Sequence, residues 1–140
     1  MTPELAFQKA IADLLIADPD VNALVNGQVF DEVPNDGEAT PPYIYLGPMN
    51  RRRVQMDCGQ VWTITARLYA ISVEFGRGQA WETIEAIVQA LDMKEAPDVT
   101  LTAPFSIQQP IQITQGGDVV DPLAPKSVFV DLSTIIARDN

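Results

Sequence analysis

The stretch GQVWTITARLYAIS, residues 59–72, decides the fold. Every second side chain in it is apolar, and this apolar face consists of Trp62, Ile64, Ala66, Leu68 and Ala70. Because successive side chains of a strand point to opposite faces, a period of two predicts a long β-strand with one face in the core. At about 3.3 Å per residue, residues 60–73 span about 46 Å, whereas a domain of this chain length is about 37 Å across. The strand is therefore expected to bend or to project beyond the domain, and a projecting edge favours assembly with a partner.

A shorter strand precedes it in PPYIYLGP, residues 41–48. Proline cannot donate a hydrogen bond to a neighbouring strand, so the prolines on both sides limit this strand to Tyr43–Leu46. Another short strand is predicted at Gln28–Asp31. Residues 47–58, which include the run Arg51–Arg53, are expected to form a loop or the ragged start of the long strand.

Two helices are predicted, one before and one after these strands. The first begins at Thr2-Pro3-Glu4, where threonine suits the N-cap and proline the first turn. It ends by Ala17, because Pro19 disfavours helix in the residue before it, and a short helical turn then leads to Asn26-Gly27. The second helix follows Gly76–Gly78 and has one apolar face, made of Ala80, Ile84, Ile87, Val88 and Leu91.

Beyond Pro97 the sequence again favours strands. Residues 105–114 alternate in part, but Pro110 predicts an edge strand or a bulge there. The segment QGGD, residues 115–118, predicts a turn, and Lys126–Ile136 predicts a long final strand. The chain is thus expected to form one α+β domain, residues 1–140, with a mostly antiparallel sheet of about five strands and two helices packed on one face.

Charge is unevenly distributed along this acidic chain, whose net charge is −10. Residues 1–50 hold eight acidic residues against Lys9 alone, whereas residues 51–94 hold six of the nine basic residues. Broad nucleic-acid binding is disfavoured, because phosphates would be repelled, although an acidic wall could let DNA pass without sticking. The separation of the two signs either lets one copy attract the next or is simply a solvated surface.

The sequence contains few candidate catalytic residues. There is no histidine, which removes the commonest general base and the commonest metal ligand. Cys58 is the one candidate nucleophile, and its surroundings favour a structural residue instead. Gly76-Arg77-Gly78 precedes a helix, but it lacks both the Walker lysine and the Rossmann glycine spacing. We therefore predict no catalytic residue, cofactor or metal site.

Interface residues are the remaining candidates for function. The run Arg51, Arg52 and Arg53 brings three positive charges together, and Arg77 lies in an exposed connection before the second helix. Trp81 lies off the centre of the apolar helix face and is expected to be partly exposed. These five residues are candidates for contact with another subunit or a connector protein. The alternative for the arginine run is a solvated loop, and for Arg77 an ordinary connection between strand and helix.

Targeting signals are not evident in this sequence. No apolar run approaches the roughly 20 residues that a membrane helix needs. The start MTPELAFQKA lacks the basic and then apolar layout of a signal peptide. A single cysteine fits a reducing compartment. We expect a protein made in the cytoplasm that has no membrane partner.

Several motifs together resemble one known family. They are ELAFQKAIxxLLxxD from Glu4, VxxLVNGxVFDxVP from Val21, PPYIYLG from Pro41 and AWETIEAIVQAL from Ala80. This pattern is similar to the tail completion or tail terminator family of long-tailed bacteriophages and gene transfer agents, over roughly residues 4–92. The resemblance implies that the NGxVFD and PYIYLG segments pair as short strands that hold the first helix on the sheet.

The resemblance also implies a structural role. Terminators form rings, commonly of six copies, on the head-proximal end of the tail tube, where they stop its polymerisation and join it to the head connector. The implied partners are copies of the same chain, the tail tube protein and the head–tail connector, with DNA passing through the lumen without specific binding. The implied location is the neck of the virion. The acidic loop Asp31–Glu38 and the segment QQPIQITQGGD, residues 108–118, depart from many relatives, so no contact residue is carried over.

Two alternatives stay open from the sequence. A head-completion or adaptor protein of the same neck would also form a ring, but it would dock on the portal side. A small ligand-binding module, or an enzyme that uses Cys58, belongs to a different class of function.

Overall fold

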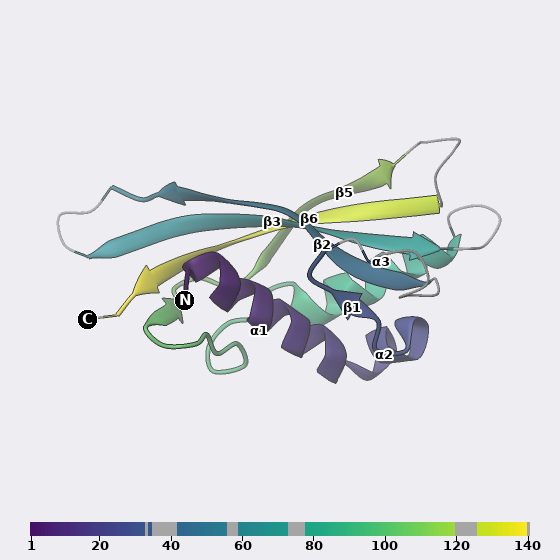
Figure 1. Ribbon diagram of the computed structural model, residues 1–140, viewed down its shortest axis with the longest axis horizontal. Coiled ribbons are helices and arrows are strands. Elements are labelled where there is room, and N and C mark those ends of the chain that lie inside the picture. The colour runs from purple at the N-terminus through teal and green to yellow at the C-terminus, as the bar shows by residue number, and fades with distance from the viewer. Residues whose placement is uncertain (33, 35–41, 56–58, 73–77, 120–125, 140) are drawn as a thin grey trace.

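Helices and strands form two layers in the computed structural model, which describes residues 1–32, 34, 42–55, 59–72, 78–119 and 126–139 (Figure 1). Within these residues the helices are α1 (Pro3–Ala17), α2 (Pro19–Val25) and α3 (Gly78–Leu91). The strands are β1 (Val29–Phe30), β2 (Tyr43–Arg53), β3 (Gln60–Ser72), β4 (Phe105–Ile107), β5 (Gln112–Val119) and β6 (Lys126–Arg138). The α+β class is thus confirmed. The described residues form three helices instead of two, because the short turn after Pro19 is a helix, and six strands instead of about five.

The sheet is mixed, with strand order β1-β2-β3-β6-β4 and with β5 also paired to β6. β1 lies parallel to β2, and the other pairs are antiparallel. The central pair is the longest, because β3 and β6 match residue for residue from Gln60–Arg138 to Ser72–Lys126. These two strands run along the long axis of the molecule, and one end of the β2–β3 pair projects beyond the first turn of α1 (Figure 1). The short parallel pair of β1 and β2 joins the NGxVFD and PYIYLG segments as expected.

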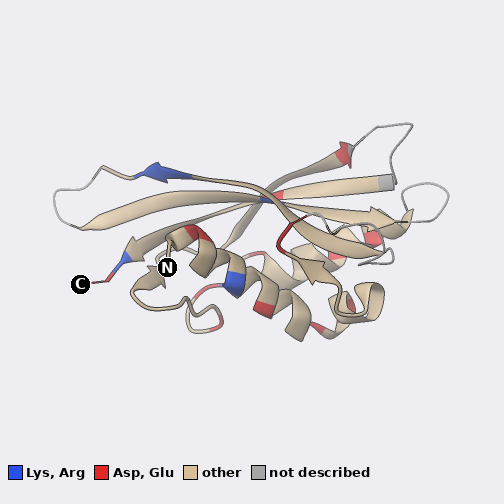
Figure 2. Ribbon diagram, viewed as in Figure 1, with Lys and Arg blue, Asp and Glu red and all other residues tan. Residues whose placement is uncertain are grey.

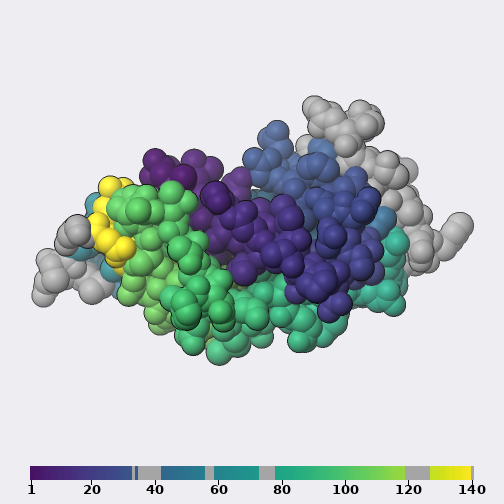
Figure 3. Space-filling model, turned by 90° about the horizontal axis from the view of Figure 1, so that it is seen from below, coloured from purple at the N-terminus to yellow at the C-terminus, as the bar shows by residue number. Residues whose placement is uncertain are grey.

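The core lies between the sheet and the helices, which share one side of it (Figures 1 and 3). The apolar face predicted for β3 is buried in full. The final strand buries its own alternate side chains, namely Val128, Val130, Leu132, Thr134 and Ile136. From the helix side, α1, α2, α3 and the segment that follows α3 cover the strands (Figure 3). The other side of the sheet has no described helix over it.

The helix ends follow the sequence signals. The Thr2 hydroxyl accepts a hydrogen bond from the Leu5 amide at 3.1 Å. Asp18 separates α1 from α2 and caps α2. Its carboxylate accepts hydrogen bonds from the Asp20 and Val21 amides, both at 3.0 Å. Asn26 then ends α2 in the left-handed conformation, with φ of 52°. Side-chain capping and a residue that tolerates positive φ therefore set both boundaries.

The predicted limit of the short strand at Leu46 is wrong, and of residues 47–58, predicted as a loop or the ragged start of the long strand, residues 47–53 instead belong to β2. β2 continues through the Gly47-Pro48 pair to Arg53, and its register against β3 shifts between Leu46 and Met49. This bulge places Pro48, which has no amide hydrogen, where the ladder is already interrupted. Gly47 is needed at the bulge, because a Cβ there would lie 2.5 Å from the Cε2 atom of the Tyr69 ring.

The prediction of a turn at residues 115–118 is also wrong. Pro110 divides the expected strand into β4 and β5, and the QGGD segment lies inside β5. A register shift between Ile113 and Gln115 bends this strand. The glycines serve close packing, because a Cβ on Gly117 would lie 3.2 Å from the ring of Phe129. Two adjacent glycines thus mark a crowded edge strand here.

Candidate interaction site

Basic residues at the ends of β2 and β6 lie at one end of the molecule (Figure 2). Arg51, Arg52 and Arg53 close β2, and Arg138 closes β6. The strand register brings the two groups together, because Arg53 pairs with Trp62 of β3 and Arg138 pairs with Gln60, two residues earlier. We call Arg51, Arg52, Arg53 and Arg138 the basic end. The sequence predicted its first three members, whereas the fourth is 85 positions further along the chain than Arg53 (138 − 53) and needs the register to be found.

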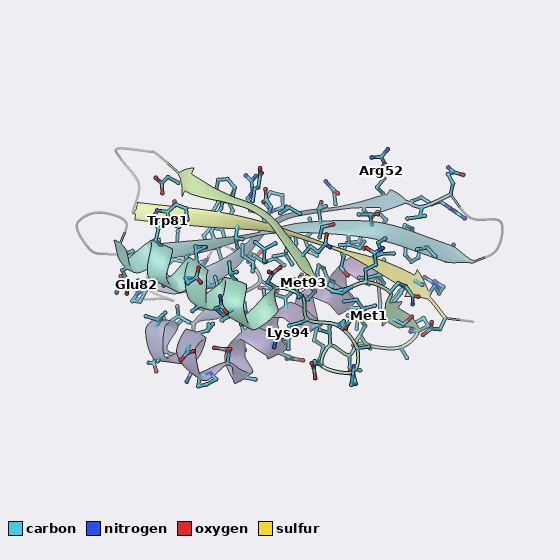
Figure 4. The ribbon with its side chains drawn as sticks, turned by 180° about the vertical axis from the view of Figure 1, so that it is seen from behind. Met1, Arg52, Trp81, Glu82, Met93 and Lys94 are labelled. Atoms are coloured by element: carbon cyan, nitrogen blue, oxygen red, sulfur yellow. The ribbon has the colours of Figure 1, made fainter. Side chains whose placement is uncertain are left out.

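The arginines of β2 point to different faces of the sheet. Arg51 pairs with Ile64 and Arg53 with Trp62, both of which have their side chains on the helix side. Arg52 pairs with Thr63 and therefore points to the helix-free side (Figure 4). The three consecutive charges thus do not act as one patch.

Arg51 is engaged within the molecule. Its Nε and Nη2 atoms donate to the two carboxylate oxygens of Glu4 in the first turn of α1, at 2.5 Å and 3.1 Å. Its guanidinium carbon lies 5.4 Å from the ring centroid of Trp62. This pairing ties the end of β2 to α1. Arg52 and Arg53 form no ion pair with any other described residue and are exposed.

The opposite end of the molecule carries an exposed tryptophan beside carboxylates (Figure 4). Trp81, Glu82 and Glu85 lie on the first turns of α3, and we call them the α3 patch. Trp81 is 42% exposed, although its neighbours Ala80 and Thr83 are buried. Glu85 lies four residues after Trp81 and therefore on the same helix face. The predicted partial exposure of Trp81 is confirmed, whereas Arg77 lies outside the described residues, as does Cys58.

The helix-free side of the sheet carries a charged pair that sequence reasoning missed. Arg67 of β3 faces Asp131 of β6, and its Nε and Nη2 atoms donate to the carboxylate oxygens at 2.7 Å and 3.1 Å. Gln115 donates a further hydrogen bond to Asp131, and the Arg67 guanidinium carbon lies 4.0 Å from the ring centroid of Phe129. A surface hollow of about 450 Å³ lies beside this pair.

These contacts shift both pKa values. The hydrogen bond from Arg67 lowers the pKa of Asp131, partial burial opposes that change, and the Gln115 hydrogen bond adds to it. The hydrogen bond to Asp131 raises the pKa of Arg67, so the guanidinium stays charged. Sequence alternation placed Arg67 on the outward face, but no signal linked it to an aspartate 64 positions away.

Aromatic rings extend along the same side of the sheet. Tyr45 stacks on Tyr69 with ring centroids 4.9 Å apart, and Tyr69 meets the edge of Phe129 at 6.3 Å. Tyr43 packs next to Tyr45 and against Phe30. Burial raises the pKa of the Tyr45 hydroxyl, and the neighbouring Tyr69 and Tyr43 raise it further. The row stiffens the uncovered face of the sheet.

The side chains on these surfaces suit contact with another protein. Within the described ranges, no three His, Cys, Asp or Glu side chains gather as a metal site requires. The shifted pKa values belong to a charged pair and a tyrosine stack that hold the sheet together. None of the helices in the described part of the chain is long and apolar enough to cross a membrane.

Comparison with protein families identifies one family. The model of the family described as "Tail completion protein gp17" matches residues 9–137. A comparison with curated proteins gives no significant match. Among solved structures, a chain from the virion of a native gene transfer agent particle has the same fold, with a TM-score of 0.77 and 24% sequence identity. The match covers 96% of this chain and 95% of that one.

Proposed function

Because the chain belongs to the tail completion protein gp17 family, we propose that it is a structural protein at the head-proximal end of a phage or gene transfer agent tail. The family match extends over nearly the whole chain and confirms the resemblance carried by the sequence motifs. Proteins of this family are components of phage tails and are located in the virion. The likeness of the whole fold to a chain of a gene transfer agent virion supports the same role.

The specific role that we propose is tail termination. Six copies form a ring on the last layer of the tail tube, stop its polymerisation and present their other face to the head–tail connector. One observation supports this proposal most directly. The basic end and the acidic α3 patch lie at opposite ends of one elongated molecule (Figures 2 and 4). A ring closes through heterologous contacts, which need two different patches on each subunit.

The charge of the chain fits the passage of DNA. A net charge of −10 gives the ring a surface that repels phosphates over most of its area. DNA then passes through the lumen without specific binding, and the ring needs neither a cofactor nor catalytic activity. Arg52, Arg53 and Arg138 are confined to one end, where a neighbouring protein can cover them.

Deletion of the gene in its phage, followed by negative-stain electron microscopy of the lysate, tests this role. Loss of a terminator leaves tube growth unchecked, so we expect tails of irregular and excessive length that are not attached to filled heads. Tails of normal length beside DNA-leaking or tailless heads would instead assign the protein to the head side of the neck, as a completion or adaptor protein. Intact infectious particles would reject both roles.

A further inference from the structure

We propose that the basic end of one copy binds the α3 patch of the next copy, through Arg52 and Arg53 on one side and Trp81, Glu82 and Glu85 on the other. This contact rests on the proposed ring and names the two surfaces that close it.

The donor surface presents two charges at the end of β2, with Arg52 on the helix-free side and Arg53 on the helix side, so the next copy must contact both faces of this end. Arg52 and Arg53 are exposed and have no carboxylate partner among the described residues. The strand that carries them is held on both faces, because Arg51 bonds to Glu4 on the helix side and Asn50 accepts a hydrogen bond from Thr65 on the other, at 2.7 Å. A rigid support lowers the entropy that is lost when such long side chains bind.

The acceptor surface matches a guanidinium group in chemistry. Trp81 exposes part of its indole, and the exposed Glu82 and Glu85 flank it on the same turns of α3. An arginine placed over an indole gains a cation–π interaction, and a neighbouring carboxylate can accept two hydrogen bonds from its planar group. Glu85 is positioned for this by Gln89, which donates to its Oε1 atom at 3.0 Å. An aromatic ring together with two carboxylates is therefore a built receptor for arginine.

The positions of the two surfaces favour contact between copies. Arg52 lies at one end of the long axis, whereas Trp81 and Glu82 lie at the other (Figure 4). A single chain cannot bring the two surfaces together, because the rigid β3–β6 pair separates them. Two copies placed head to tail can, and the remaining free surface at each end then binds a further copy. Repetition of this contact around an axis gives a ring.

Charge reversal and its compensation test the contact. The gene is deleted from the phage and each variant is supplied in its place. We expect Arg52→Glu with Arg53→Glu to lower the infectious titre at least about tenfold relative to the wild-type gene, because like charges then face each other. Glu82→Arg with Glu85→Arg should lower it similarly. The four changes combined should restore the titre. A matched control, Glu95→Arg with Asp98→Arg, makes the same charge change at exposed residues beyond the other end of α3 and should leave the titre unchanged.

Outcomes are separated by two further measurements. Circular dichroism and thermal unfolding of each purified variant must match the wild type, so that a folding defect is not read as a lost contact. When a thiol oxidant is added to lysates of cells that assemble particles, Arg53→Cys with Glu82→Cys, in a Cys58→Ser background, should yield a ladder of disulfide-linked multimers. Lys9→Cys with Glu82→Cys, in the same background, should not. Cross-links without a tail-length defect on deletion would reject only the terminator role. A tail-length defect without compensation or cross-links would reject only the contact.

Discussion

Arg67 and Asp131 show how a single pair organises the helix-free side of the sheet. They face each other across the central strands β3 and β6. Gln115 donates a hydrogen bond to the Asp131 carboxylate, and the Phe129 ring packs against the Arg67 guanidinium. The two strands that flank the central pair here both shift register close to Arg67 and Asp131, β2 between Leu46 and Met49 and β5 between Ile113 and Gln115. The pair therefore links the central strands beside both register shifts. Protonation of Asp131 removes the charge that Arg67 binds, so this contact is sensitive to acid.

Asp131→Asn is expected to reduce stability at neutral pH more than at acid pH. The folded pKa of Asp131 lies below its unfolded value of about 3.9, so its contribution is fully present above that value and is lost as the pH falls through the folded pKa. Urea midpoints at about pH 7 and about pH 2 measure the effect. The variant should have a lower midpoint than the wild type near pH 7, and this gap should shrink near pH 2. Asp98→Asn, at an exposed position, serves as the control, and a gap of equal size at both pH values would contradict the account.

Strands and helices differ in how far the sequence determines them. Local signals place the helices, because Thr2 and Asp18 cap their own neighbours within three residues. Alternation likewise places β3 and its buried face. The length of β2 and the course of β5 depend on contacts with distant residues, since Gly47 packs on Tyr69 and Gly117 on Phe129. Glycine and proline predict turns when only neighbouring residues are considered. At both bulges, packing against distant residues keeps the chain in a strand and overrides this local signal.

Gly47→Ala is expected to destabilise the β2 bulge. The added Cβ would lie 2.5 Å from Tyr69 Cε2 and 3.3 Å from the Arg67 carbonyl oxygen, and the Tyr69 ring is confined between Tyr45 and Phe129. Such overpacking typically costs about 1–3 kcal/mol of unfolding free energy. Gly78→Ala is the matched control, because among the described residues no atom outside its own helix backbone and chain neighbours lies within 4 Å of its added Cβ. Urea denaturation of both variants measures the difference, and equal stabilities would show that the close approach at Gly47 is unimportant.

The whole molecule is a rod-like subunit with unlike ends. The sequence shows the separation of charge, since the arginine run and the acidic first third are visible in it. It does not show that α3 carries Trp81 to the end opposite the arginines, because that depends on how the helix returns over the sheet (Figure 4). Of the five predicted interface residues, Arg51 is bound to Glu4 within the chain, and Arg52, Arg53 and Trp81 remain available to a partner.

We propose that this chain terminates the tail as a ring. A three-dimensional reconstruction of the neck of the wild-type particle tests it most directly. The account predicts six copies of this fold in one layer, between the last ring of the tail tube and the head–tail connector, with Arg52 and Arg53 of each copy against α3 of the next. The account would be contradicted if this fold were found on the portal side of the connector, or if the layer above the tube were built from another protein.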